Sequence, residues 1–195
     1  MKRFLIVAVL AVFANSFSQD MWKTSIELDF GFPSGWEYEY QSAPHKFTYV
    51  DLEDSGFLLN SFGIQGYHGY FITNTLSIGP VGGFNYQSVH KLSMLRLGAR
   101  FQLHFADRNN AFTYLQVSSN FSLNYEKFKA GPHIRCGLAF PVMRGDAHML
   151  SLNLFGELNN YYMNGSKPLL EYIGSETPVL LREKLHIGIS IGITF

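Results

Sequence analysis

Ionisable side chains recur at every second position in part of this sequence. Between residues 95 and 105, Arg96, Arg100 and His104 occupy even positions, while every odd position is apolar. Side chains two residues apart on an extended strand point to the same face. One face of this segment therefore carries two guanidinium groups and an imidazole, which can form charge-assisted hydrogen bonds with carboxylates.

Carboxylates suited to such pairs lie on the polar faces of other alternating segments. If the short turn at 144–146 joins its strands symmetrically, Glu157 lies opposite His133 and diagonal to Arg135. We predict that these groups neutralise one another as a polar plug, because buried charges need partners; a gate or proton path is the alternative. The predicted network consists of Glu27, Asp29, Arg96, Arg100, His133, Arg135 and Glu157, with Lys129 and His186 on the same side.

The seven histidines raise the question of a metal site. His104, His133 and His186 are all expected to face inward. The directions of their strands place His104 at one end and the other two near the opposite end, so the three cannot bind one ion. We therefore predict no metal site and no cofactor.

The elements that position these residues are strands. Alternation with a period of two predicts eight of them, which are joined by short connections except at 33–56 and 161–183. With the N-terminus at the periplasmic side, both long connections lie outside the cell, as in outer-membrane barrels. The predicted fold is all-β, an eight-stranded antiparallel up-and-down transmembrane β-barrel. Its expected strands are 22–32, 57–71, 74–87, 95–105, 110–124, 128–142, 147–160 and 185–195.

Composition and the first residues narrow the class of protein further. The 195 residues carry no net charge, which excludes the basic surface of a nucleic-acid-binding protein. Cys136 is the only cysteine, so an internal disulfide framework is excluded. Lys2 and Arg3, an apolar run at 4–13 and small residues up to Ser18 predict a signal peptide at 1–18, which leaves 19–195 as the barrel.

Aromatic side chains on the apolar faces gather at the strand ends. Soluble barrels also alternate, but they give aromatics no reason to form two belts, whereas lipid interfaces do. The absence of Asp, Glu, Lys and Arg from the apolar faces of the six most regular strands also favours a membrane barrel, as does the low share of charged residues, 15%. The predicted girdle includes Trp22, Tyr70, Phe105 and Phe140 on the periplasmic side, and Tyr86 and Phe128 on the outer side.

The chain resembles the small eight-stranded outer-membrane β-barrel proteins, a group that includes outer-membrane protein A-type and PorT-like proteins. The local motif is the last strand, with Ile191, Ile193 and Phe195 on one face. The resemblance implies that these residues form the signal read by the barrel-assembly machinery. It also implies a place in the outer membrane of a Gram-negative cell, in contact with lipid and lipopolysaccharide.

An enzyme is an alternative within this class, because some small outer-membrane barrels modify lipid A with a serine and a histidine. His45, His68 and His90 are expected on the outer side, with Asp51, Ser55 and Ser88 in reach. No His-x-Ser motif accompanies them. The sequence favours a protein without enzymatic activity.

We therefore expect a structural or interaction protein of the cell envelope, with the long connections as its contact surface. Segment 33–56 is acidic and aromatic, a composition that suits a protein or glycan partner. Two alternatives stay open: the segments extend the strands and pack over the barrel mouth, or the barrel is a narrow, porin-like channel for small solutes.

Overall fold

The protein folds into antiparallel β-strands. The computed structural model describes residues 21–43, 46–52, 58–124, 128–145, 147–164 and 177–195. The predicted signal peptide and its cleavage after Ser18 lie outside these residues and stay a prediction. The strands are β1 (Trp22–Ala43), β2 (Lys46–Leu52), β3 (Ser61–Phe71), β4 (Leu76–Gln87), β5 (Leu92–His104), β6 (Phe112–Ser122), β7 (Phe128–Arg144), β8 (Met149–Met163) and β9 (Thr177–Thr194).

No helix in the described part of the chain has the length and apolar character needed to cross a membrane.

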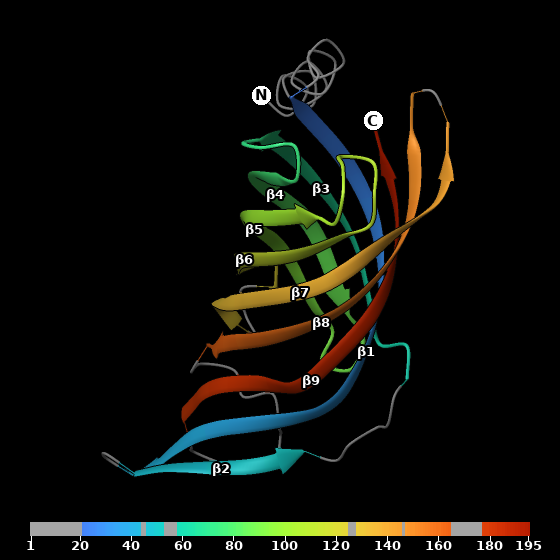
Figure 1. The fold of residues 1–195 in the computed structure, drawn as a ribbon. Coiled ribbons are helices and arrows are strands. Elements are labelled where there is room, and N and C mark those ends of the chain that lie inside the picture. Colours follow the sequence, from blue (N-terminus) through green and yellow to red (C-terminus); the bar gives the residue numbers. More distant parts are fainter. Residues whose placement is uncertain (1–20, 44–45, 53–57, 125–127, 146, 165–176) are drawn as a thin grey trace, which may run out of the picture.

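The sheet closes on itself. Each strand from β3 to β9 pairs with the next, and β1 pairs with β3 on one side and with β9 on the other. Ser25 lies opposite both Tyr67 and Thr194, so the ladder is complete around the ring (Figure 1). The prediction of an eight-stranded antiparallel barrel is confirmed, with β1 and β3 to β9 as the eight strands.

β2 is a ninth strand outside the ring, so 33–56 is not a loop throughout. Of the alternatives for the two long connections, the one in which they extend the strands is confirmed for the described residues. β1 continues to Ala43, and β2 runs back along its second half (Figure 1). Register shifts between Pro33 and Trp36 reverse the face that each later side chain of β1 occupies. The strict period of two therefore breaks at this point, and the sequence pattern does not predict that the strand continues. The expectation for 161–183 is wrong in the same way at both of its ends, because β8 reaches Met163 and β9 begins at Thr177.

The two ends of the barrel differ. At the turn end, β1 begins, β9 finishes and the tight turns 72–75 and 105–111 join neighbouring strands. At the opposite end, the hairpin end, β1 and β2 extend beyond the ring (Figure 1). This is the asymmetry of short turns and long connections that the sequence predicted.

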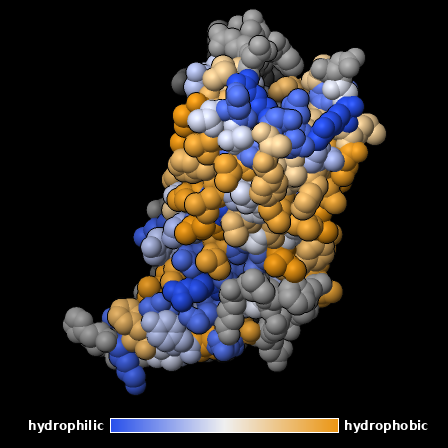
Figure 2. All heavy atoms as spheres, in the orientation of Figure 1, coloured by the Kyte–Doolittle hydropathy of each residue, from blue (hydrophilic) through white to orange (hydrophobic). Residues whose placement is uncertain are grey.

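The alternation of the sequence separates the outside of the barrel from its interior. On β5, Leu97 is 48% exposed, whereas Arg100 is completely buried. Apolar side chains cover most of the visible wall between more hydrophilic ends (Figure 2). The assignment of apolar faces outward and polar faces inward is therefore confirmed on the strands where the alternation was regular.

One member of the predicted aromatic girdle is misplaced. Phe128 is fully buried inside the hairpin end, and Lys129, expected in the lumen, is exposed. Both errors have one cause, a register shift between Phe128 and Ala130 that inserts an extra residue into β7. The other members contribute to the outer wall, where Trp22, Tyr70, Phe105 and Phe140 are exposed and Tyr86 is half-buried.

Two glycines test the packing of this wall. A Cβ on Gly98 would press against the Val117 carbonyl and Ser118, whereas one on Gly156 would meet only the His186 carbonyl, at 3.8 Å. Gly98→Ala should therefore lower the free energy of unfolding by about 1 to 3 kcal/mol. Gly156→Ala should raise it by about 0.4 to 1 kcal/mol, because it restricts the unfolded chain. Urea unfolding of refolded barrels measures both, and equal effects would contradict this packing.

Candidate functional site

The barrel interior holds a layer of paired charges. Arg100 binds Glu27 through two hydrogen bonds, from Nη1 to Oε1 at 2.5 Å and from Nη2 to Oε2 at 2.9 Å. Arg135 reaches Asp29 Oδ2 at 2.8 Å and Glu157 Oε2 at 2.7 Å. All five side chains are buried, so these are ion pairs removed from water.

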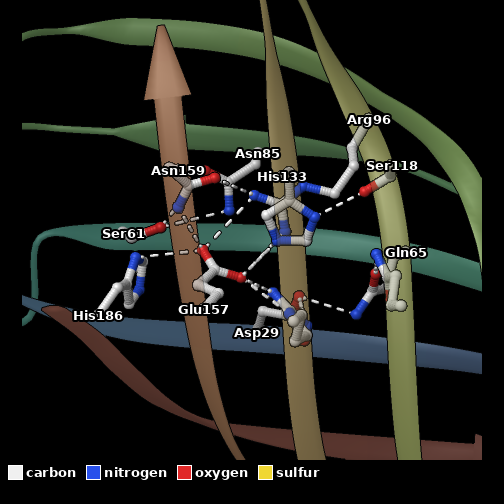
Figure 3. Close-up of polar contacts among 12 residues, drawn as sticks. Asp29, Ser61, Gln65, Asn85, Arg96, Ser118, His133, Glu157, Asn159 and His186 are labelled. Carbon is white, nitrogen blue, oxygen red and sulfur yellow. Dashed lines mark hydrogen bonds and ion pairs between the residues drawn. The ribbon is translucent and has the colours of Figure 1, made fainter. Parts of the chain in front are cut away.

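Glu157 accepts from several donors at once (Figure 3). Besides Arg135, the Arg96 guanidinium lies 3.1 Å from its Oε2, and His133 Nε2 lies 3.0 Å from the same oxygen. Its other oxygen faces His186 Nδ1 at 3.1 Å and the Asn159 amide at 2.9 Å. Glu157 is thus the carboxylate on which most of the layer converges.

The register of β7 and β8 brings Glu157 to this position. Glu157 lies opposite Arg135, and His133 lies opposite Asn159, so the prediction that Glu157 faces His133 directly is wrong. The turn is centred later than expected, since Arg144 pairs with Met149 and Gly145 N–H donates to the His148 carbonyl. All seven residues of the predicted network nevertheless lie in the interior, where the structure connects them.

Amide side chains fill the spaces between the charges. Gln65 donates to Glu27 and Asp29 at 3.0 and 3.1 Å, and Gln116 accepts from Arg100 at 3.1 Å. Asn120 accepts from Arg96 at 2.9 Å. The alternation of the sequence places these amides on the inward faces, but it does not distinguish them from the other polar residues there.

Two apolar clusters flank the charged layer. The first lies at the hairpin end and consists of Trp36, Tyr38, Leu92, Met94, Phe128, Tyr161, Met163 and Leu181. The second lies toward the turn end and consists of Phe112, Tyr114, Ala139 and Phe155. Arg135 and Arg100 lie over the Phe155 and Tyr114 rings, 3.9 and 4.6 Å from their centroids, which joins the charged layer to the second cluster.

Glu183 is a further buried acid, at the end of the segment 161–183 that was predicted to be a connection. Its carboxylate lies 3.1 Å from His186 Nδ1 and accepts from the amides of Gln87 and Asn159, at 2.7 and 2.6 Å. A register shift separates the pair Gly35–Leu185 from the pair Trp36–Glu183. Glu183 therefore points inward, although the alternation of 185–195 places odd-numbered residues on the outside.

Glu157, Glu183 and His186 offer ligand atoms within 4.8 Å of one another, the arrangement that a metal ion would need. Glu157 already lies against two guanidinium groups, whose positive charges oppose a divalent cation. Amide donors occupy the oxygens of Glu183. The contacts of these three residues are therefore typical of a network of hydrogen bonds and ion pairs rather than of a metal centre.

The residues of the enzymatic alternative are separated. β3 runs toward the turn end, so His68 bonds Thr24 Oγ1 at 2.9 Å there and stacks on Trp22. His90 contacts the Trp36 ring at the opposite, hairpin end, so the prediction that His68 and His90 lie on the same outer side is wrong. His45 and Ser55 lie outside the described residues.

A second serine motif of hydrolases, the Gly-x-Ser-x-Gly spacing, occurs once in the sequence, at 188–192. In hydrolases this motif forms a sharp turn between a strand and a helix that exposes the serine. Here it lies within β9, and Ser190 is completely buried in the lumen. The structural context of a nucleophilic serine is absent at this position.

A pair of conservative substitutions tests the buried charges. Glu157→Gln keeps the shape of the side chain but leaves two buried guanidinium groups short of one negative charge, and we expect a loss of about 3 to 5 kcal/mol in the free energy of unfolding. Glu37→Gln is the matched control: its ion pair with Arg182, at 3.6 Å, is partly exposed, and the expected cost is about 0 to 1 kcal/mol. Urea unfolding in vesicles measures both, and a small effect of Glu157→Gln would show that the layer is dispensable.

Comparison with known proteins identifies no family. No protein-family model matches the chain, and no curated protein matches it either. Among solved structures, the outer membrane protein OprG of Pseudomonas aeruginosa is 8% identical, with 89% of this chain and 95% of that chain covered and a TM-score of 0.47. Neisserial surface protein A is 11% identical over the same shares, with a TM-score of 0.45. A de novo designed transmembrane β-barrel is 11% identical, covering 89% and 98%, with a TM-score of 0.42.

Proposed function

We propose that this chain is a non-enzymatic integral protein of the outer membrane, with a structural or interaction role in the cell envelope. Its barrel is a closed support without an open pore, and its β1–β2 hairpin is a contact surface on the outside of the cell. The observation that carries the proposal is a wall of apolar side chains facing outward around an interior filled with paired charges.

The outer wall supports the membrane location. Leu97, Val117, Ile134 and Leu154 come from four successive strands and are 46–50% exposed. Soluble monomers rarely expose a contiguous apolar surface of more than a few hundred Å². Pairing of β1 with β9 leaves the ring no unpaired strand edge, which is the condition for crossing lipid with strands.

The filled interior supports a closed barrel over the alternative of a narrow channel. Arg100 and Arg135 are completely buried and lie against carboxylates from other strands. Apolar clusters lie on both sides of this layer. An eight-stranded barrel is just wide enough for its own side chains, so passage of a solute would require these pairs to separate.

The β1–β2 hairpin (Trp36–Ala43 and Lys46–Leu52) supports the interaction role. Glu37 lies opposite Asp51, and Glu39 lies opposite Tyr49, so these four side chains share a face. Tyr49 is 58% exposed. Carboxylates beside exposed aromatic rings can bind a protein or a glycan.

A charge placed on the wall tests the membrane location. Leu97→Arg places a cation in the middle of the apolar belt and should cost about 2 to 4 kcal/mol in a bilayer if the belt faces lipid. Met143→Arg is the control near the turn end, where the residue is 61% exposed and a cation should cost about 0 to 1 kcal/mol. Folding titrations into vesicles give both values, and equal costs would favour a soluble barrel.

Electrical recordings test the closed lumen. Purified protein inserted into a planar bilayer should show no stable channel, because buried ion pairs occupy the interior. A porin inserted in the same way serves as the positive control. A reproducible open state of large conductance in the wild type would refute the plug and support the channel.

A further inference from the structure

A cavity of about 230 Å³ lies at the turn end of the barrel. It spans the rim, since Lys23 and Phe71 from the interior line it together with Trp22 and Phe195 from the outer wall. Hydrophilic side chains gather at this end of the molecule, above the apolar wall (Figure 2). The cavity therefore lies at the end of the barrel where the outer wall gives way to hydrophilic side chains.

Cationic side chains from separate elements meet at this cavity. Lys23 comes from β1, Arg108 from the turn between β5 and β6, and Arg144 from the end of β7. Its lining contains no aspartate or glutamate among the described residues. The neighbouring Asp107 accepts the backbone N–H of Asn109 at 2.9 Å, and Asp146 lies outside the described residues.

Lys23 is the buried member of this group. Its side chain is 4% exposed, and its Nζ has no hydrogen-bond partner among the described residues. The Phe112 ring lies 4.1 Å from Nζ and supports the ammonium from the interior side. A buried ammonium group is costly unless acceptors bind it, so its three donors favour an anionic ligand in the adjoining cavity.

Neutral side chains position the two arginines. Arg108 donates to Asn74 Oδ1 at 3.2 Å and lies over the Phe71 ring. Arg144 donates to Asn110 Oδ1 at 3.2 Å. These contacts orient both guanidinium groups at the cavity.

We propose that this cavity binds a phosphate group, carried either by a soluble phosphate or by the headgroup of a phospholipid. Guanidinium and ammonium groups together are the donors that bind phosphate oxygens in proteins. Trp22 and Phe195 are 37% and 44% exposed beside the cavity, and aromatic rings of this kind lie at the level of lipid headgroups. The lipid form of the ligand rests on the proposed membrane location, whereas the phosphate site itself does not.

Calorimetry with inorganic phosphate tests the site on the full barrel in a non-ionic detergent. We expect saturable binding that weakens at least tenfold in Lys23→Met. Arg144→Gln should weaken it as well, and because Arg144 is exposed this second variant does not threaten the fold. Lys129→Gln removes an exposed positive charge at the opposite end and should leave binding unchanged.

The source of the phosphate is decided with a short-chain phosphatidylglycerol added to the same samples. If it binds at least tenfold more tightly than inorganic phosphate and depends on Lys23 and Arg144, the ligand is a lipid headgroup. If inorganic phosphate binds equally well or better with the same dependence, the ligand is soluble. Absence of binding by both probes, or binding that both substitutions leave unchanged, would overturn the proposal.

Discussion

Closure of the sheet through the β1–β9 pair is the constraint on which the rest of the structure depends. Because β1 pairs on both sides, every alternate residue of the ring must point into one narrow interior. The other half must face outward, and these side chains are mostly apolar. The alternation of the sequence therefore serves two environments at once, an outer apolar belt and an interior that has to satisfy its own polar groups.

The interior meets this requirement by balancing its charges. The layer holds three buried guanidinium groups, from Arg96, Arg100 and Arg135. The carboxylates of Glu27, Asp29 and Glu157 bind them. Arg135 joins acids from β1 and β8, so the pairs cross the lumen and connect strands that are not neighbours in the ring. Apolar clusters on both sides keep this layer away from water.

The sequence was sufficient to predict the faces of the strands, because an alternating strand has only two. It was not sufficient wherever one extra residue changed the alternation. The insertion near Lys129 moved Phe128 from the outer wall into the lumen, and a later turn centre moved Glu157 from His133 to Arg135. Glu183 was missed for a similar reason. Bulges depend on the pairing partner, which a single strand read alone does not contain.

The most direct measurement uses the native Cys136, which is exposed on the outer wall between Leu115 and Gly156. A nitroxide attached to this thiol in vesicles reports whether oxygen or a water-soluble nickel complex collides with it. If the apolar wall faces lipid, the label should be accessible to oxygen and protected from the nickel complex. Free access of the nickel complex to the label in the folded, vesicle-bound protein would contradict the account.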